Sequence, residues 1–159
     1  MDLRDELLGL VECLAEENID YAICGGIALA IHGYPRFTKD IDILVQSEDL
    51  DRAIHAVARI GFVLDSGTLP FDQGGPRARE VRRISKTEGA EVLTLDLLLV
   101  SPVLESVWSS RGGFEWQDRH LQVVSREGLV EMKRLAGRDQ DLLDVKQLES
   151  SSDKTDAQD

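Results

Sequence analysis

Residues 21–45, with the sequence YAICGGIALAIHGYPRFTKDIDILV, contain the pattern around which the rest of the chain is organised. Residues 21–24 predict a short buried strand, which Gly25 and Gly26 then interrupt. Residues 27–32 are predicted to form a short helix with Gly33 as its C-terminal cap. A strand, a glycine turn and a helix N-terminus favour a bound phosphate, because backbone N–H groups there lack partners within the helix. The alternative is a tight turn required only for packing.

Two carboxylates alternate with isoleucines at the end of this stretch, in the sequence DIDILV of residues 40–45. Side chains on a strand alternate between its faces, so Asp40 and Asp42 are predicted to share one face. Two like charges about 7 Å apart repel each other unless a cation lies between them. Hard divalent ions, Mg²⁺ first and Mn²⁺ as a substitute, prefer such oxygen ligands. The alternative is an edge strand with two solvated carboxylates.

This combination resembles the signature of the nucleotidyltransferase superfamily, in which a hydrophobic residue and a Gly-Gly or Gly-Ser pair precede an Asp-hydrophobic-Asp motif. Cys24, Gly25 and Gly26 match the first part, and the run from Asp40 to Asp42 matches the second. The stretch is similar to the minimal nucleotidyltransferases of bacteria and archaea, especially to the abortive-infection toxin transferases. The resemblance implies a Mg²⁺-dependent transferase of toxin-antitoxin type that uses a nucleoside triphosphate. It also implies an antitoxin-like protein as a possible partner.

A third carboxylate, Asp96, interrupts the apolar run of residues 91–100, EVLTLDLLLV. This run and residues 80–85 flank the turn-like segment 86–90, which predicts a β-hairpin. Burying a carboxylate among leucines is costly without a partner, so Asp96 is predicted to face the same acidic cleft as Asp40 and Asp42. The superfamily pattern also places a third carboxylate on a later strand. The alternative is a structural carboxylate with satisfied hydrogen bonds.

Lys133 and Arg138 lie in the segment MKRLAGRDQD of residues 132–141. Basic residues at the C-terminal end of a helix are ordinarily favourable partners for its dipole. The segment is also similar to the abortive-infection toxin transferases, which carry a Lys, a spaced Arg and a later Asp in this region. On that resemblance, Lys133 and Arg138 contact the nucleotide phosphates, and Asp141 or Asp144 has a supporting role.

Two further residues, Arg36 and Thr38, lie in the loop ahead of the first two carboxylates. Loops on a rigid scaffold supply binding residues, but they also need residues that fix their own conformation. Arg36 and Thr38 are therefore predicted either to contact a phosphate or to hold the loop in place.

Composition limits the class of protein. The 159 residues suit one domain, and 42% hydrophobic with 5% aromatic residues is typical of an aliphatic α/β protein. The net charge of -12 argues against binding nucleic acid through bulk electrostatic attraction. Cys13 and Cys24 lack the spacing of a zinc site or a disulfide framework, and no apolar run reaches membrane-spanning length. We therefore expect a cytoplasmic protein with no membrane partner.

The predicted fold is α/β, with a small mixed sheet of the nucleotidyltransferase type, flanking helices and a short C-terminal helical extension. Helices are predicted over residues 3–17, 48–60, 102–108, 126–136 and 140–148, and further strands over 62–64, 80–85, 91–100 and 121–124. Residues 66–79 are predicted as a mobile loop, and Gly112 and Gly113 as the end of a turn. Residues 1–149 form the predicted domain, and residues 150–159 a disordered tail.

The predicted activity is transfer of a nucleoside monophosphate from a nucleoside triphosphate to an acceptor hydroxyl, with release of pyrophosphate. Asp40 and Asp42 would hold two Mg²⁺ ions. Asp96 would complete the coordination of the inner ion and help to deprotonate the acceptor hydroxyl. The alternative is a catalytically silent module of the same fold that binds a nucleotide or a partner protein. The acceptor stays open between a tRNA end, a protein side chain and a small molecule such as an aminoglycoside. A Rossmann dinucleotide site is disfavoured, because the glycine turn lacks the G-x-G-x-x-G spacing.

Overall fold

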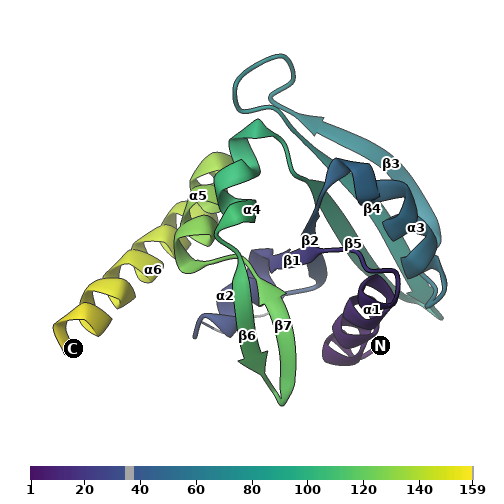
Figure 1. Cartoon of the computed structure of the whole chain (residues 1–159), viewed down its shortest axis with the longest axis horizontal. Coiled ribbons are helices and arrows are strands. Elements are labelled where there is room, and N and C mark those ends of the chain that lie inside the picture. Colours follow the sequence, from purple (N-terminus) through teal and green to yellow (C-terminus); the bar gives the residue numbers. More distant parts are fainter. Residues whose placement is uncertain (35–37, 159) are drawn as a thin grey trace.

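The computed structural model describes residues 1–34 and 38–158, and it describes side chains as far as residue 150. The predicted site residue Arg36 lies outside the described residues. Within these residues the chain forms a mixed seven-stranded sheet with the order β3-β4-β5-β2-β1-β7-β6 (Figure 1). The strands are β1 (Tyr21–Cys24), β2 (Asp40–Val45), β3 (Leu64–Phe71), β4 (Arg79–Glu88), β5 (Glu91–Leu99), β6 (Gly112–Trp116) and β7 (Arg119–Val123). The helices are α1 (Leu3–Glu16), α2 (Gly25–Ile31), α3 (Leu50–Ala58), α4 (Glu105–Ser109), α5 (Arg126–Ala136) and α6 (Asp139–Gln158), with 3₁₀ turns η1 (Ser47–Asp49) and η2 (Pro102–Leu104).

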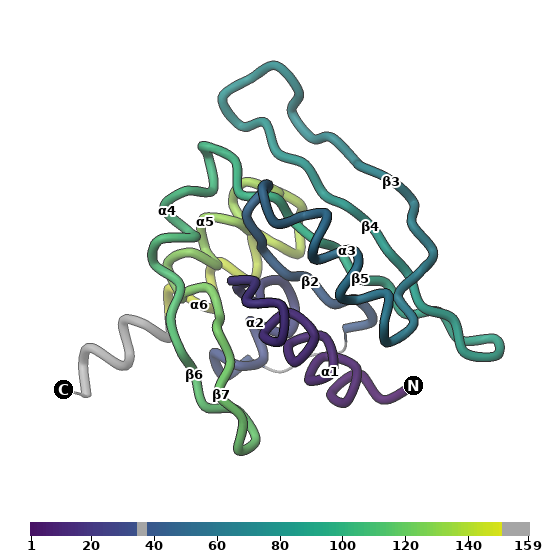
Figure 2. Tube along the Cα trace, turned by 45° about the vertical axis from the view of Figure 1, so that its right-hand side comes forward, coloured from purple at the N-terminus to yellow at the C-terminus, as the bar shows by residue number. Residues whose placement is uncertain are grey.

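The sheet carries helices on both faces (Figure 2). Helix α1 contacts α3 on one face, where Lys86 Nζ of β4 lies 2.8 Å from Glu6 Oε1 of α1. Helix α5 contacts α2, α4 and α6 on the other face. Ile41 and Ile43 of β2 are fully buried, in keeping with a strand at the centre of the sheet. This arrangement confirms the predicted α/β class, with a mixed sheet, flanking helices and a C-terminal helical pair.

Helix α5 shows how local sequence determines the ends of an element. Ser125 Oγ accepts a hydrogen bond from the Gly128 N–H at 2.9 Å, which satisfies one of the unpaired donors at the helix N-terminus. At the other end Gly137 adopts a φ of 68°, and its N–H donates to the Lys133 carbonyl at 2.9 Å. Both signals are readable from the sequence, and α5 has the predicted bounds, residues 126–136.

The prediction of a mobile loop over residues 66–79 is wrong for its first part, because β3 continues to Phe71 and pairs antiparallel with β4. Pro70 lies in β3, which is an edge strand of the sheet, the setting in which proline is ordinarily found within a sheet. The register shifts between Asp65 and Gly67, and Gly67 has a φ of 82°. This bulge depends on pairing with β4, which the local sequence does not reveal.

The other edge of the sheet also differs from expectation. Gly112 and Gly113 do not end a turn, as predicted, but begin β6, which pairs with β7. A Cβ atom at Gly113 would lie 2.5 Å from Cε1 of His120. The glycine thus leaves room for the imidazole of the paired strand, so its role here is close packing rather than chain reversal.

Helix α6 runs past residue 148, where the sequence pattern predicts its end. The boundary between a domain over residues 1–149 and a tail over residues 150–159 stays a prediction, because the side chains beyond residue 150 lie outside the described part. No helix within residues 1–34 and 38–158 is long and apolar enough to cross a membrane. Cys13 and Cys24 are both free and buried.

Candidate active site

Two neighbouring strands bring the three predicted carboxylates to one region. Strands β2 and β5 are parallel, and Asp42 lies directly opposite Asp96. On the other side of β2, Cys24 at the end of β1 also lies opposite Asp42. Because side chains alternate along a strand, Asp40 shares a face with Asp42. The carboxylates therefore gather where β1 ends and α2 begins, beside the glycine turn.

Asp42 lies in an unfavourable electrostatic position. Burial raises its pKa, and the negative charges of Asp96 and Asp40 raise it further, to about 7. The positive charges of Lys133 and Arg138 act in the opposite direction. A carboxyl group with this pKa is only partly ionised at neutral pH. Additional positive charge bound beside Asp42 would therefore be stabilised by the site.

Gly25 allows the turn after β1 to approach Asp42 closely. Its φ of +65° lies in the left-handed region that favours glycine, and a Cβ atom there would lie 2.8 Å from Asp42 Cγ. Gly26 has a different neighbour, since a Cβ atom there would lie 3.0 Å from Thr38 Oγ1. Thr38 Oγ1 donates to the Asp40 carbonyl oxygen at 3.3 Å. This contact supports the alternative that Thr38 holds the loop in place.

Arg83 is a residue of the site that the sequence analysis missed. It lies on β4 directly opposite Asp96 of β5. Its Nε donates to Asp96 Oδ1 at 2.9 Å and its Nη2 to Asp96 Oδ2 at 3.0 Å. Asp96 thus lies beside Asp42, but both of its oxygens are already hydrogen-bonded. The register of the hairpin would have identified Arg83, but the register depends on where the turn closes.

Lys133 and Arg138 lie near the carboxylates, and both are paired within the C-terminal helices. Lys133 Nζ of α5 lies 2.9 Å from Asp144 Oδ2 and 3.8 Å from Asp141 Oδ1, both on α6. Arg138 Nε donates to Asp141 Oδ2 at 2.7 Å. Lys133 is only 6% exposed, whereas the side chain of Arg138 is 79% exposed. Lys133 therefore joins two helices as a buried ion pair, and Arg138 presents an exposed guanidinium group.

The chemistry of the carboxylates fits a hard divalent cation. Carboxylate oxygens are the ligands that such ions prefer, and burial together with the charges of Asp96 and Asp40 raises the pKa of Asp42. Asp96 fits as a further ligand only when Arg83 releases it. Among the residues that the structure describes, no three Asp, Glu, His or Cys side chains form a ready-made metal cluster. Binding of a cation would thus use Asp40 and Asp42 first and require rearrangement at Asp96.

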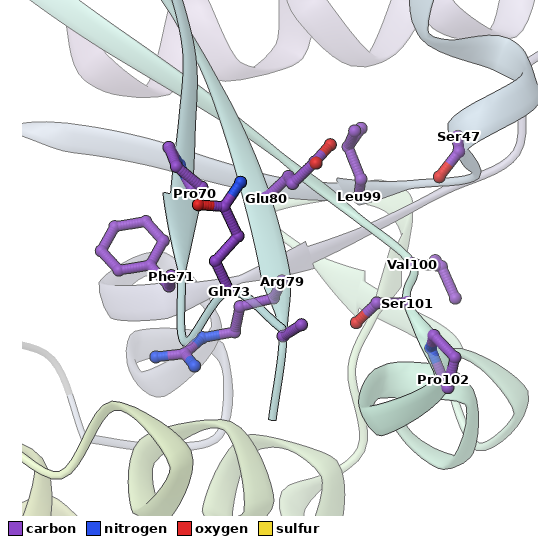
Figure 3. Close-up of a pocket in the computed structure, with 11 residues that line it drawn as sticks. Ser47, Pro70, Phe71, Gln73, Arg79, Glu80, Leu99, Val100, Ser101 and Pro102 are labelled. Carbon is purple, nitrogen blue, oxygen red and sulfur yellow. The ribbon is translucent and has the colours of Figure 1, made fainter. Parts of the chain in front are cut away.

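A separate cavity of about 300 Å³ lies between the β3–β4 hairpin and the segment that follows β5 (Figure 3). Its walls combine apolar and polar side chains, among them Phe71, Arg79, Glu80, Leu99 and Ser101. The Ser101 hydroxyl is buried and lacks a hydrogen-bond partner among the described residues. None of the three carboxylates lines this cavity. It is of a size that accommodates a small molecule.

The sheet order, the glycine turn and the paired aspartate strands are features of one fold class, that of the nucleotidyltransferases. The family described as "Uncharacterised nucleotidyltransferase" matches residues 1–131, and the chain belongs to this family. The superfamily predicted from residues 21–45 is thereby confirmed. No curated protein matches the chain in sequence.

Solved structures share this fold at low sequence identity. The lincosamide antibiotic adenylyltransferase LnuA, with lincomycin bound, is 16% identical with a TM-score of 0.61 over 92% of this chain and 96% of that chain. A putative nucleotidyltransferase from Thermotoga maritima is 13% identical with a TM-score of 0.61 over 91% of each chain. ANT(2'')-Ia in complex with adenylyl-2''-tobramycin is 14% identical with a TM-score of 0.57 over 95% of this chain and 91% of that chain. These similarities establish the fold, and the toxin-like subtype stays a prediction.

Proposed function

We propose that the chain is a metal-dependent nucleotidyltransferase, which moves a nucleoside monophosphate from a nucleoside triphosphate to an acceptor hydroxyl and releases pyrophosphate. The observation that carries the proposal is the position of Asp42, opposite Asp96 and against Gly25. Burial and like charges raise the pKa of Asp42 to about 7. A carboxylate in this position destabilises the fold unless a cation compensates it, which suggests that it is kept for chemistry.

The three carboxylates have distinct roles in this proposal. Asp40 and Asp42 hold Mg²⁺ or Mn²⁺, and Asp96 joins them as a further ligand. A bound divalent ion would polarise the phosphate under attack and offset the charge that develops on it. Asp96 also accepts the proton of the acceptor hydroxyl. Asp42 remains ionised in the loaded site, because added positive charge lowers its pKa.

The triphosphate is bound, in this proposal, by the backbone of the Gly25 and Gly26 turn and by nearby cations. Arg138 suits a direct contact, because its guanidinium is exposed and its planar fork matches phosphate oxygens. Lys133 is buried and paired with α6, so its main contribution is to position that helix and to add positive charge near the site. Arg36, which precedes the carboxylates in the sequence, is a further candidate for a phosphate contact.

Isothermal titration with Mn²⁺ and each of the four ribonucleoside triphosphates, followed by a pyrophosphate-release assay with a panel of acceptors, tests the proposal. We expect triphosphate binding that depends on the divalent ion. Asp42→Asn should abolish this dependence, whereas Glu115→Gln, which changes an exposed carboxylate of β6, should not. Triphosphate binding that is absent, or that is indifferent to both Mn²⁺ and Asp42, would refute the proposal.

A catalytically silent nucleotide-binding module is the second candidate function. The contact of Arg83 with both oxygens of Asp96 favours it, because a permanently paired Asp96 is not free to act as a ligand or base. This candidate predicts triphosphate binding without pyrophosphate release for any acceptor. The two measurements described above therefore separate the two functions.

We propose a small hydroxyl-bearing molecule as the first acceptor class to test. The net charge of -12 disfavours a tRNA end, because the phosphates of RNA would be repelled. LnuA and ANT(2'')-Ia were solved with lincomycin and adenylyl-2''-tobramycin, so lincosamides and aminoglycosides form a sensible first panel. A protein side chain as acceptor, and an antitoxin-like partner in a cytoplasmic setting, are the alternatives.

A further inference from the structure

Arg83 and Asp96 form a bidentate ion pair at the edge of the carboxylate site. The two hydrogen bonds, at 2.9 and 3.0 Å, use Nε and Nη2 of the guanidinium and both oxygens of the carboxylate. The side chain of Asp96 is 12% exposed, whereas that of Arg83 is 43% exposed. The pair therefore consists of a buried anion and a cation that can move into solvent.

The charge of Arg83 acts on the whole carboxylate site. Its pKa is raised first by its hydrogen bond with Asp96, and the charges of Asp40 and Asp42 also raise it. The positive charge of this guanidinium thus faces the same three carboxylates that would bind a divalent ion. Two cations cannot occupy the oxygens of Asp96 together without repelling each other.

The hairpin leaves space for Arg83 to move. Its cross-strand partner on β3 is Gly67, which has no side chain and lies at the register shift of the strand. A Cβ atom at Gly67 would have no neighbour within 4 Å. The β3 residue opposite Arg83 therefore contributes no side chain that would block the guanidinium, and the side chain of Arg83 is partly exposed to solvent.

We propose that Arg83 is an internal competitor for the metal ion. Its guanidinium neutralises Asp96 when the site lacks a divalent cation and releases Asp96 when the cation binds. Arg83 consequently lowers the metal affinity of the site and keeps Asp96 paired with a positive charge in the metal-free protein. This inference rests on the proposed function, since it assumes that the three carboxylates bind a metal.

The test is a Mn²⁺ titration of the full chain, without nucleotide, in which electron paramagnetic resonance counts the free ion. Arg83→Gln should bind Mn²⁺ roughly three- to thirtyfold more tightly than the native chain, because it removes a charge-assisted competitor. Arg82→Gln is the matched control, since Arg82 is the neighbouring residue of β4 and pairs with Asp65 instead. Its Mn²⁺ affinity should equal that of the native chain within about twofold. Adding Asp96→Asn to Arg83→Gln should abolish the gain.

Melting curves give a second readout that does not depend on activity. Without divalent ions Arg83→Gln should melt below the native chain, because Asp96 loses its counter-ion, and Mn²⁺ should raise its melting temperature more than that of the native chain. If Arg83→Gln does not fold, Arg83→Lys, which keeps the charge but not the fork, should show a smaller gain in Mn²⁺ affinity. Unchanged or weaker Mn²⁺ binding in a folded Arg83 variant would overturn the inference and leave the proposed function standing. Absence of Mn²⁺ binding in every variant at millimolar ion would overturn both.

Discussion

Replacement of Asp42 by Asn is the perturbation that most directly tests whether this carboxylate is kept at a cost to stability. The substitution preserves the size of the side chain and removes its negative charge. Burial and the charges of Asp96 and Asp40 raise the pKa of Asp42 from 3.8 to about 7. The fold therefore opposes ionisation of Asp42, and the amide removes that opposition. We expect Asp42→Asn to be more stable than the native chain in metal-free solution above pH 7.

The dependence on pH follows from proton binding. Between the ordinary pKa of 3.8 and the raised pKa of about 7, the folded protein binds more protons at Asp42 than the unfolded chain does. The free energy of unfolding therefore falls as pH rises through this interval, and the loss is complete above it. A shift of this size corresponds to at most about 4 kcal/mol. Because the surroundings of a buried charge relax and admit water, the effective interaction is weaker than this limit, and we expect about 1–3 kcal/mol in measurement.

Urea unfolding at pH 5 and pH 8 with a chelator present measures this effect. The difference in stability between Asp42→Asn and the native chain should have about a third of its full size at pH 5 and reach its full size at pH 8. Asp65→Asn is the matched control for net charge, because Arg82 lowers the pKa of Asp65 and its removal should therefore not stabilise the protein. An Asp42→Asn variant that is no more stable than the native chain at pH 8 would refute this reasoning and make Asp42 a structural carboxylate.

Three other substitutions test neighbouring parts of the site. Gly25→Ala should lower the free energy of urea unfolding by about 1–3 kcal/mol, because its φ is +65° and its Cβ would collide with the Asp42 carboxylate; native-like stability would show that the turn can relax. Lys133→Ala should lower the free energy of unfolding by about 3–5 kcal/mol, because it removes the ion pair with the buried Asp144. The same variant should bind a triphosphate roughly ten- to a hundredfold more weakly in a titration with Mg²⁺. Arg138→Ala should change stability by less than about 1 kcal/mol yet weaken triphosphate binding roughly three- to tenfold; equal affinities in calorimetry would exclude it from the site.

The parts of the fold that the sequence predicts well have signals within a few residues of each other. The strand and helix of residues 21–31 form one such unit, although α2 begins at Gly25, two residues before its predicted start. Ser125 and Gly137 cap α5 through contacts with residues at most four positions away. The alternation of Asp40 and Asp42 is likewise local, because a period of two needs only the extended backbone. The family signature could therefore be recognised before any tertiary contact was known.

The parts that were missed depend on contacts between distant segments. The length of β3 is determined by pairing with β4, and Pro70 and Gly67 gave the opposite local signal. Arg83 belongs to the site only because the hairpin register places it opposite Asp96. The ion pair of Lys133 depends in the same way on the packing of α5 against α6, which no local pattern encodes. The motif within residues 21–45 consequently does not identify the residues that other elements contribute to the site.

Two of the cations near the carboxylates, Lys133 and Arg83, differ in a way that suits them to different functions. Lys133 is 6% exposed and is held by acidic side chains that are themselves buried, so moving it would break a buried network. Arg83 is held by one carboxylate, and much of its side chain already faces solvent. In the proposed metal-bound state, a divalent ion would therefore displace Arg83 more easily than Lys133. Removal of Lys133 should accordingly reduce stability, whereas removal of Arg83 should raise metal affinity. The same effect of both substitutions on stability and on metal affinity would contradict this division of functions.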